Sequence, residues 1–245
     1  MFRSGLLYRC IREENSIQLT ATYMNLNGII SLLIACIELV FVINLLIFAE
    51  KNAVNKLIIA AILLLSGYQF IEFVICFAGF QKQLLIYFAF LDISLLPPLG
   101  LFAVLKFANR QKDYHYAIFI PALFFIVYYP FALNEFAVTK CTVLYASYHY
   151  PLGPLYATFY YLPIIASMII LNKKWGAETE KKSKSLTRLM FFGYLFTFMP
   201  AMIIALFSPG FISAVESLLC KMAFIFATFL TLFVLKNKAE FKKEN

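Results

Sequence analysis

Long runs of apolar residues, separated by short polar connections, occupy most of the chain. Runs of this length predict helices that cross a lipid bilayer, because about 17–25 apolar residues span the ~30 Å of hydrocarbon. The predicted spans are about 29–49, 57–79, 84–105, 117–133, 154–171, 189–208 and 213–235. The pattern therefore predicts an all-α integral membrane protein, folded as a seven-transmembrane helix bundle.

Composition leads to the same class of protein. Of the 245 residues, 62% are hydrophobic and only 14% are charged. A water-soluble domain with so few charged side chains would leave much apolar surface in water, so the lipid bilayer is the first predicted partner.

Lysine and arginine residues are distributed unevenly between the two sides of the predicted bundle. Fifteen of the 21 lie in the connections 50–56, 106–116 and 172–188 or in the tail 236–245, whereas five lie on the opposite side. Basic residues near helix ends resist export, so the side with fifteen is predicted to be cytoplasmic. We therefore expect a multi-pass protein of the plasma (inner) membrane, with residues 1–28 as a short extracytoplasmic tail and 236–245 as a basic cytoplasmic tail.

The net charge of +8 follows from this bias and needs no nucleic acid to explain it. The most basic connection, 172–188, is the predicted contact for anionic lipid or for a cytoplasmic signalling partner.

Prolines lie inside four of the predicted spans, and each removes a backbone donor and crowds the preceding turn. They are Pro97 and Pro98, Pro121 and Pro130, Pro163, and Pro200. We expect helix kinks at these positions, of which Pro97, Pro98 and Pro200 are the candidates for carrying a conformational change.

Five ionisable side chains lie within the predicted spans, where a charge costs roughly 2.5–3.5 kcal/mol on insertion scales. They are Glu38, Glu72, Asp92, Glu216 and Lys221. The predicted orientation places all five in the outer half of the bilayer, roughly 5–14 Å below its outer boundary.

Three of the five have polar neighbours that suggest one site. Gln69 and Glu72 share a helix face, Tyr68 lies beside them, and Lys221 needs a partner on another helix, which we expect to be Glu72 or Asp92. Glu72, Asp92, Lys221, Gln69 and Tyr68 therefore form the predicted ligand-binding set. A hydrogen-bonded packing cluster and a proton relay or transport path are the other interpretations of these residues.

Glu38 and Glu216 are assigned to packing, because each lies near a helix end or lacks polar companions. The chain contains two histidines, His115 and His149, in or beside connections on opposite sides of the membrane. This excludes a metal site with several histidine ligands at one depth and a histidine-activated nucleophile. We accordingly expect no catalytic residues, no metal and no cofactor, including retinal on Lys221.

The five cysteines have no CxxC spacing. An external disulfide such as Cys10–Cys141 is one pairing that their positions allow, but the spacing determines none.

Two segments resemble a known bacterial group. They are Gly67-Tyr68-Gln69-Phe70-Ile71-Glu72-Phe73 and Leu95-Leu96-Pro97-Pro98-Leu99-Gly100-Leu101-Phe102. They resemble the second and third helices of the seven-transmembrane sensory region at the amino end of many histidine kinases and diguanylate cyclases. The resemblance implies a sensory input, here stand-alone and signalling through a separate partner at the inner face.

The sequence thus predicts a receptor-like protein that binds a small ligand or cation in an outer-half polar pocket. The alternative is a small-solute or proton-coupled transporter, which requires a polar path to the inner face, where the spans hold little beyond Asn44 and Lys106. The third interpretation is a structural or assembly subunit.

Overall fold

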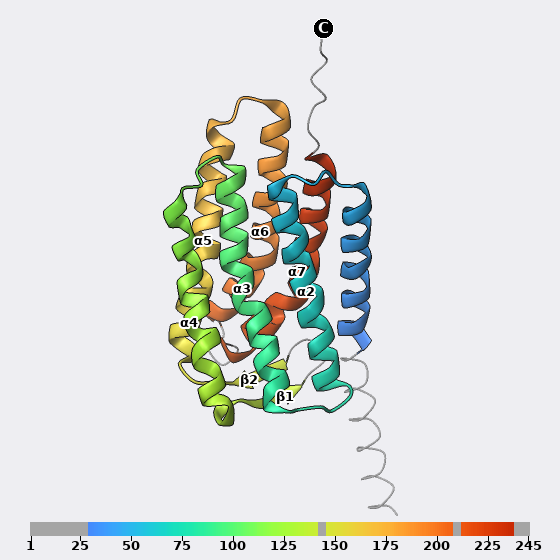
Figure 1. The fold of residues 1–245 in the computed structure, drawn as a ribbon, viewed down its shortest axis with the longest axis vertical. Helices are drawn as coiled ribbons and strands as arrows, with labels where there is room; N and C mark the ends of the chain where they lie inside the picture. Colours follow the sequence, from blue (N-terminus) through green and yellow to red (C-terminus); the bar gives the residue numbers. More distant parts are fainter. Residues whose placement is uncertain (1–28, 142–145, 208–211, 238–245) are drawn as a thin grey trace, which may run out of the picture.

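The computed structural model describes residues 29–141, 146–207 and 212–237, and these are mostly helical. Long helices lie side by side in an elongated bundle, as Figure 1 shows. They are the first helix Ile29–Phe48, α2 (Ala53–Cys76), α3 (Gln83–Phe107), α5 (Gly153–Ala177), α6 (Lys181–Phe207) and α7 (Ile212–Lys236). The predicted tails lie wholly (1–28) or almost wholly (236–245) outside the described residues.

Five helices within the described ranges are long and apolar enough to cross a membrane. They are Ile29–Phe48, Ala53–Cys76, Gln83–Phe107, Tyr114–Glu135 and Gly153–Ala177. This confirms the prediction of a helical membrane protein in its general form. The count of seven spans, the orientation and the kind of membrane stay predictions.

The first helix shows why such helices suit a bilayer. Its buried positions are Ser31, Ala35, Glu38, Val42 and Leu45, which are spaced alternately four and three residues apart and so form one narrow seam. Apart from Asn44, the exposed side chains of this helix are apolar, and Ile47 and Phe48 are about two-thirds accessible. A continuous exposed apolar surface of this kind is what lipid chains would cover.

The fourth predicted span corresponds to one helical stretch, Tyr114–Glu135, which consists of three consecutive segments. A 3₁₀ helix, η1 (Asp113–Phe119), leads into α4 (Ile120–Tyr128), which is followed by a second 3₁₀ helix, η2 (Tyr129–Glu135). Pro121 and Pro130 each lie in the first turn of a segment, where a missing backbone N–H breaks no hydrogen bond. The prolines of α3, α5 and α6 lie inside continuous helices, and the kinks expected there stay predictions.

Two short strands add an element that the helical pattern did not predict. Strands β1 (Ala137–Cys141) and β2 (Ala146–His149) pair antiparallel, with Ala137 opposite His149 and an irregularity in the register between Val138 and Lys140. The hairpin lies at one end of the bundle, beside the carboxyl end of α2 and the amino end of α3 (Figure 1).

A disulfide and an aromatic cluster hold this hairpin. Cys141 of β1 is bonded to Cys76 at the last residue of α2, so the pairing Cys10–Cys141 is wrong. The Phe90 ring of α3 contacts five aromatic rings around the hairpin, those of Tyr129, Phe136, Tyr148, Tyr150 and Tyr156. The hairpin is therefore attached to the bundle by a disulfide bond and by aromatic packing.

Candidate functional site

Lys221 of α7 is the centre of a polar cluster between three helices. Its ammonium group lies 3.0 Å from Glu72 Oε1 and donates hydrogen bonds to Gln69 Oε1, at 3.0 Å, and to Ser31 Oγ. A lysine ammonium has three N–H donors, and these three acceptors match them in number. The prediction that Lys221 pairs with Glu72 or Asp92 is confirmed for Glu72.

The local sequence explains this convergence. Gln69 and Glu72 are three residues apart, so both face α7 from one side of α2. Ser31 belongs to the buried seam of the first helix. Ser31, Gln69 and Glu72 are at most 1% exposed, and the Lys221 side chain is 9% exposed. The cluster is closed to bulk solvent.

Glu38 lies on the same seam, seven residues and about two helical turns from Ser31. It is fully buried within electrostatic range of the Lys221 ammonium, and neither carboxyl oxygen has a hydrogen-bond partner within the described residues. The sequence analysis assigned Glu38 to packing and did not place it near Lys221. The seven-residue spacing from Ser31 is the sequence signal that would have placed Glu38 beside the cluster.

Asp92 lies elsewhere. Its Oδ2 atom is packed against the backbone of Gly67, only 2.7 Å from where a Cβ would stand. It lines a groove together with Cys36 and Leu39, and it forms no ion pair within the part of the chain that the structure describes. Gly67 and Gln69 point to opposite sides of α2, so contact with Gly67 separates Asp92 from Lys221.

Tyr68, the fifth predicted residue, is 2% exposed and belongs to the central core. Glu216 is within α7, but its side chain lies outside the described residues. Of the predicted set, the structure therefore brings Glu72, Gln69 and Lys221 into direct contact and leaves Asp92 out.

Toward the basic end of the bundle, the polar cluster gives way to apolar side chains. Val42, Leu45, Ile62, Ala227 and Leu230 are buried there. Beyond them, buried Asn55 accepts a 2.8 Å hydrogen bond from Asn237 and donates one to the Glu50 carbonyl. These contacts join the ends of α2 and α7. The described residues show no polar path through this layer.

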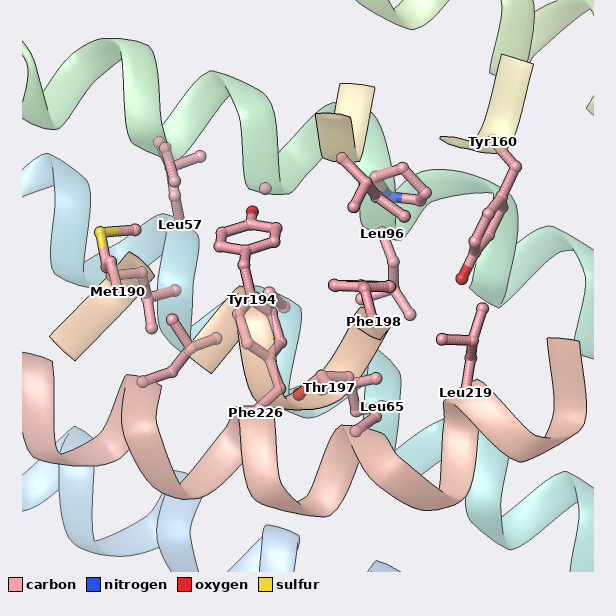
Figure 2. A pocket seen from close by; sticks show the side chains of 18 residues that line it. Leu57, Leu65, Leu96, Tyr160, Met190, Tyr194, Thr197, Phe198, Leu219 and Phe226 are labelled. Carbon is pink, nitrogen blue, oxygen red and sulfur yellow. The ribbon is translucent and has the colours of Figure 1, made fainter. Parts of the chain in front are cut away.

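A separate cavity of about 50 Å³ lies between α2, α3, α5, α6 and α7 (Figure 2). Its lining is almost entirely apolar and includes neither Lys221, Glu72 nor Gln69. The cavity and the charged cluster are thus two distinct features of the bundle.

The chain matches no protein-family model, no curated protein and no solved structure. The resemblance of residues 67–73 and 95–102 to bacterial sensory regions therefore stays a prediction.

The predicted partner segment 172–188 forms a tight helical turn. Helix α5 continues to Ala177 and α6 begins at Lys181, and this end of the pair extends past the ends of α2 and α3 (Figure 1). Glu178 in the turn accepts hydrogen bonds from Ser183, at 2.5 Å, and from Lys174, at 2.9 Å. These contacts hold the turn together and lower the pKa of Glu178 to about 2, with Ser183 as the larger cause.

Substituting Glu178→Gln should make a small, pH-dependent difference to stability. A carboxyl group whose pKa is depressed stabilises the folded state above its unfolded pKa, about 4.3, and this contribution disappears as the pH falls through about 2. Unfolding of both proteins measured across this range should show the stability difference narrowing toward acid. Glu135→Gln, an exposed site, is the control, and a difference independent of pH would contradict the assignment.

Proposed function

We propose that this protein is a receptor-like, multi-pass protein of the plasma (inner) membrane whose buried cluster binds a proton. The observation that carries the proposal is Glu38, a fully buried carboxyl group without hydrogen-bond partners among the residues that the structure describes, within electrostatic range of the Lys221 ammonium that already pairs with Glu72. In this proposal the ligand, predicted from the sequence as a small molecule or cation, is a proton.

Charge balance supports this choice. With Glu38 and Glu72 ionised and Lys221 protonated, the cluster would carry a net charge of −1 in a closed, apolar environment. An uncompensated buried charge costs several kcal/mol, and one proton on Glu38 removes it. The charged group within electrostatic range of Glu38 is Lys221 of α7, which is paired with Glu72 of α2, while Asp92 and Cys36 line a separate groove.

A metal ion suits the site less well. Within residues 29–141, 146–207 and 212–237, no three His, Cys, Asp or Glu side chains are placed to hold a metal ion. The Lys221 ammonium already occupies the position of a cation between the acceptors, and it would repel a second one.

Two independent features support the predicted orientation, with the amino terminus outside and the carboxyl terminus in the cytoplasm. One is the excess of basic residues at 50–56, 106–116 and 172–188. The other is the disulfide Cys76–Cys141 at the opposite end, since disulfides persist outside the cytosol. This orientation places the cluster in the outer half of the bilayer, nearer to the external face than to the cytoplasmic one.

A receptor-like role is favoured over transport because buried apolar side chains separate the cluster from the basic end, where Asn55 and Asn237 are hydrogen bonded. The resemblance to sensory regions supports the same role. In this proposal, proton binding changes the packing of the first helix, α2 and α7. Bending at Pro97, Pro98 and Pro200 carries the change to a partner at 172–188.

The test is the pH dependence of unfolding for wild type and Glu38→Gln. A proton that Glu38 holds only in the folded state makes the free energy of unfolding fall by about 1.4 kcal/mol per pH unit as the pH rises above about 4.3, the pKa of a glutamate in the unfolded chain. Glutamine keeps the shape of the neutral acid but does not titrate, so this slope should be absent. Glu135→Gln is the exposed control. If Glu38→Gln and wild type show the same slope, Glu38 binds no proton in this range, and the cluster serves only to pack the helices together.

A further inference from the structure

An open groove lies over the outer side of α2, which is placed between the first helix and α3 (Figure 1). Its volume is about 500 Å³, whereas a cavity of about 150 Å³ already holds benzene. Leu39, Leu63 and Phe70 belong to its lining, and each of them is about half exposed. The groove therefore has room for an elongated apolar molecule.

One carboxyl group reaches this groove. Asp92 lies nine residues, or about 14 Å, from the beginning of α3, and it is partly exposed. Its Oδ2 atom lies against Gly67, which has no side chain to cover it. Within the described residues, Asp92 forms neither an ion pair nor a hydrogen bond. An ionised carboxylate at this depth in an apolar bundle is costly unless a cation accompanies it.

Ser66, the residue before Gly67, supplies a further acceptor in the lining. Its hydroxyl donates a 2.9 Å hydrogen bond to the Ala35 carbonyl, which leaves the Ser66 oxygen able to accept one. Together with the two carboxylate oxygens of Asp92, this oxygen matches the three donors of a primary ammonium group. A calcium or magnesium ion takes about six or more oxygen ligands, so the groove suits an ammonium group better than a metal ion.

The side chains beside Gly67 favour a thin occupant. Leu63 and Phe70 precede and follow Gly67 by four and three residues, so they stand about 10 Å apart along α2. A single alkyl chain passes between them and reaches Asp92. A whole helix is about 10–12 Å wide with its side chains and would rest on Leu63 and Phe70 instead.

We propose that this groove binds a lipophilic amine, an alkyl chain that ends in a primary ammonium group. The ammonium group pairs with Asp92 and hydrogen bonds Ser66, while the chain packs against Leu39 and Leu63. Such a molecule enters from the bilayer, because its chain partitions into hydrocarbon. The groove lies apart from Lys221, and the proposal does not depend on proton binding at Glu38.

The experiment measures binding of n-octylamine and n-octanol, which share a chain length, to the full-length protein in non-ionic detergent by calorimetry. Asp92→Asn keeps the shape of the side chain and removes its charge. We expect it to weaken octylamine binding by about 10-fold or more, as the loss of a hydrogen bond to a charged group implies, and to leave octanol binding unchanged. A melt of each variant checks that it is folded. Equal changes for the two compounds would overturn the role of Asp92.

A second pair of variants tests the groove itself. Cys36→Phe fills the groove from the exposed side of the first helix and should abolish octylamine binding. Leu33→Phe adds a ring at an exposed position of the same helix outside the groove and should bind normally.

Two results would overturn the proposal. If octylamine binds Cys36→Phe as it binds wild type, the amine lies in detergent or at another site. If octylamine does not bind wild type, the groove is left to another occupant, such as a transmembrane helix of a second protein. Glu38→Gln should bind octylamine as wild type does, so failure here is distinguishable from failure of the proton site.

Discussion

Lys221→Met should lower the free energy of unfolding by about 3–5 kcal/mol, the cost expected when one partner of a buried ion pair is removed. Methionine fills a similar volume, so the loss is electrostatic rather than steric. Without the ammonium group, Glu72 loses its ion-pair partner, Gln69 and Ser31 lose a donor, and Glu38 loses the nearest positive charge. Thermal or denaturant unfolding of the purified protein measures the loss. Lys82→Met, at an exposed position, is the control.

The rescue of this variant identifies the interaction responsible. Adding Glu72→Gln to Lys221→Met removes the carboxylate that the lysine compensated, so the double variant should recover most of the lost stability. A double-mutant cycle isolates the coupling between the two residues. If Lys221→Met is as stable as wild type, or if Glu72→Gln adds a further full loss, the pair does not stabilise the fold and the cluster model of the site is wrong.

Breaking the disulfide should have the second large effect. Cys76 and Cys141 are 65 residues apart in the sequence. A disulfide that closes a loop of this length lowers the conformational entropy of the unfolded chain, which stabilises the folded state by up to about 4 kcal/mol. Cys141→Ala should therefore lower the melting temperature, and a reducing agent should have the same effect on wild type. The measurement is a melt with and without reductant.

Cys36→Ala is the matched control, since Cys36 is a free, exposed cysteine. It should melt like wild type and keep its sensitivity to reductant. A wild-type protein that is indifferent to reductant would show that the hairpin is held by the Phe90 aromatic cluster alone. It would also remove the disulfide as support for the predicted orientation.

The sequence predicted the polar site in part, and the reasons differ by residue. Gln69 and Glu72 were recognisable because helical spacing puts them on one face, and Lys221 because a buried lysine requires a counter-charge. Asp92 was included because its depth matched, whereas in the structure it lies against Gly67 and is not paired with Lys221. Glu38 was assigned to packing, because the sequence does not show which helix packs against the buried face of the first helix that carries it.

The amino-acid sequence by itself determined that the chain folds into long apolar helices suited to lipid and that Lys221 needs a buried partner. Both follow from local composition and from the cost of an isolated charge in an apolar medium. Only the tertiary structure decided that Glu38 joins Lys221, that Cys141 pairs with Cys76, and that Asp92 lines a separate groove. The physical reason is that these helices are apolar on nearly every face, so their periodicity does not define which face meets which neighbour. The rotation of each helix about its own axis is set by side-chain packing between different helices, such as the contact of Asp92 with Gly67.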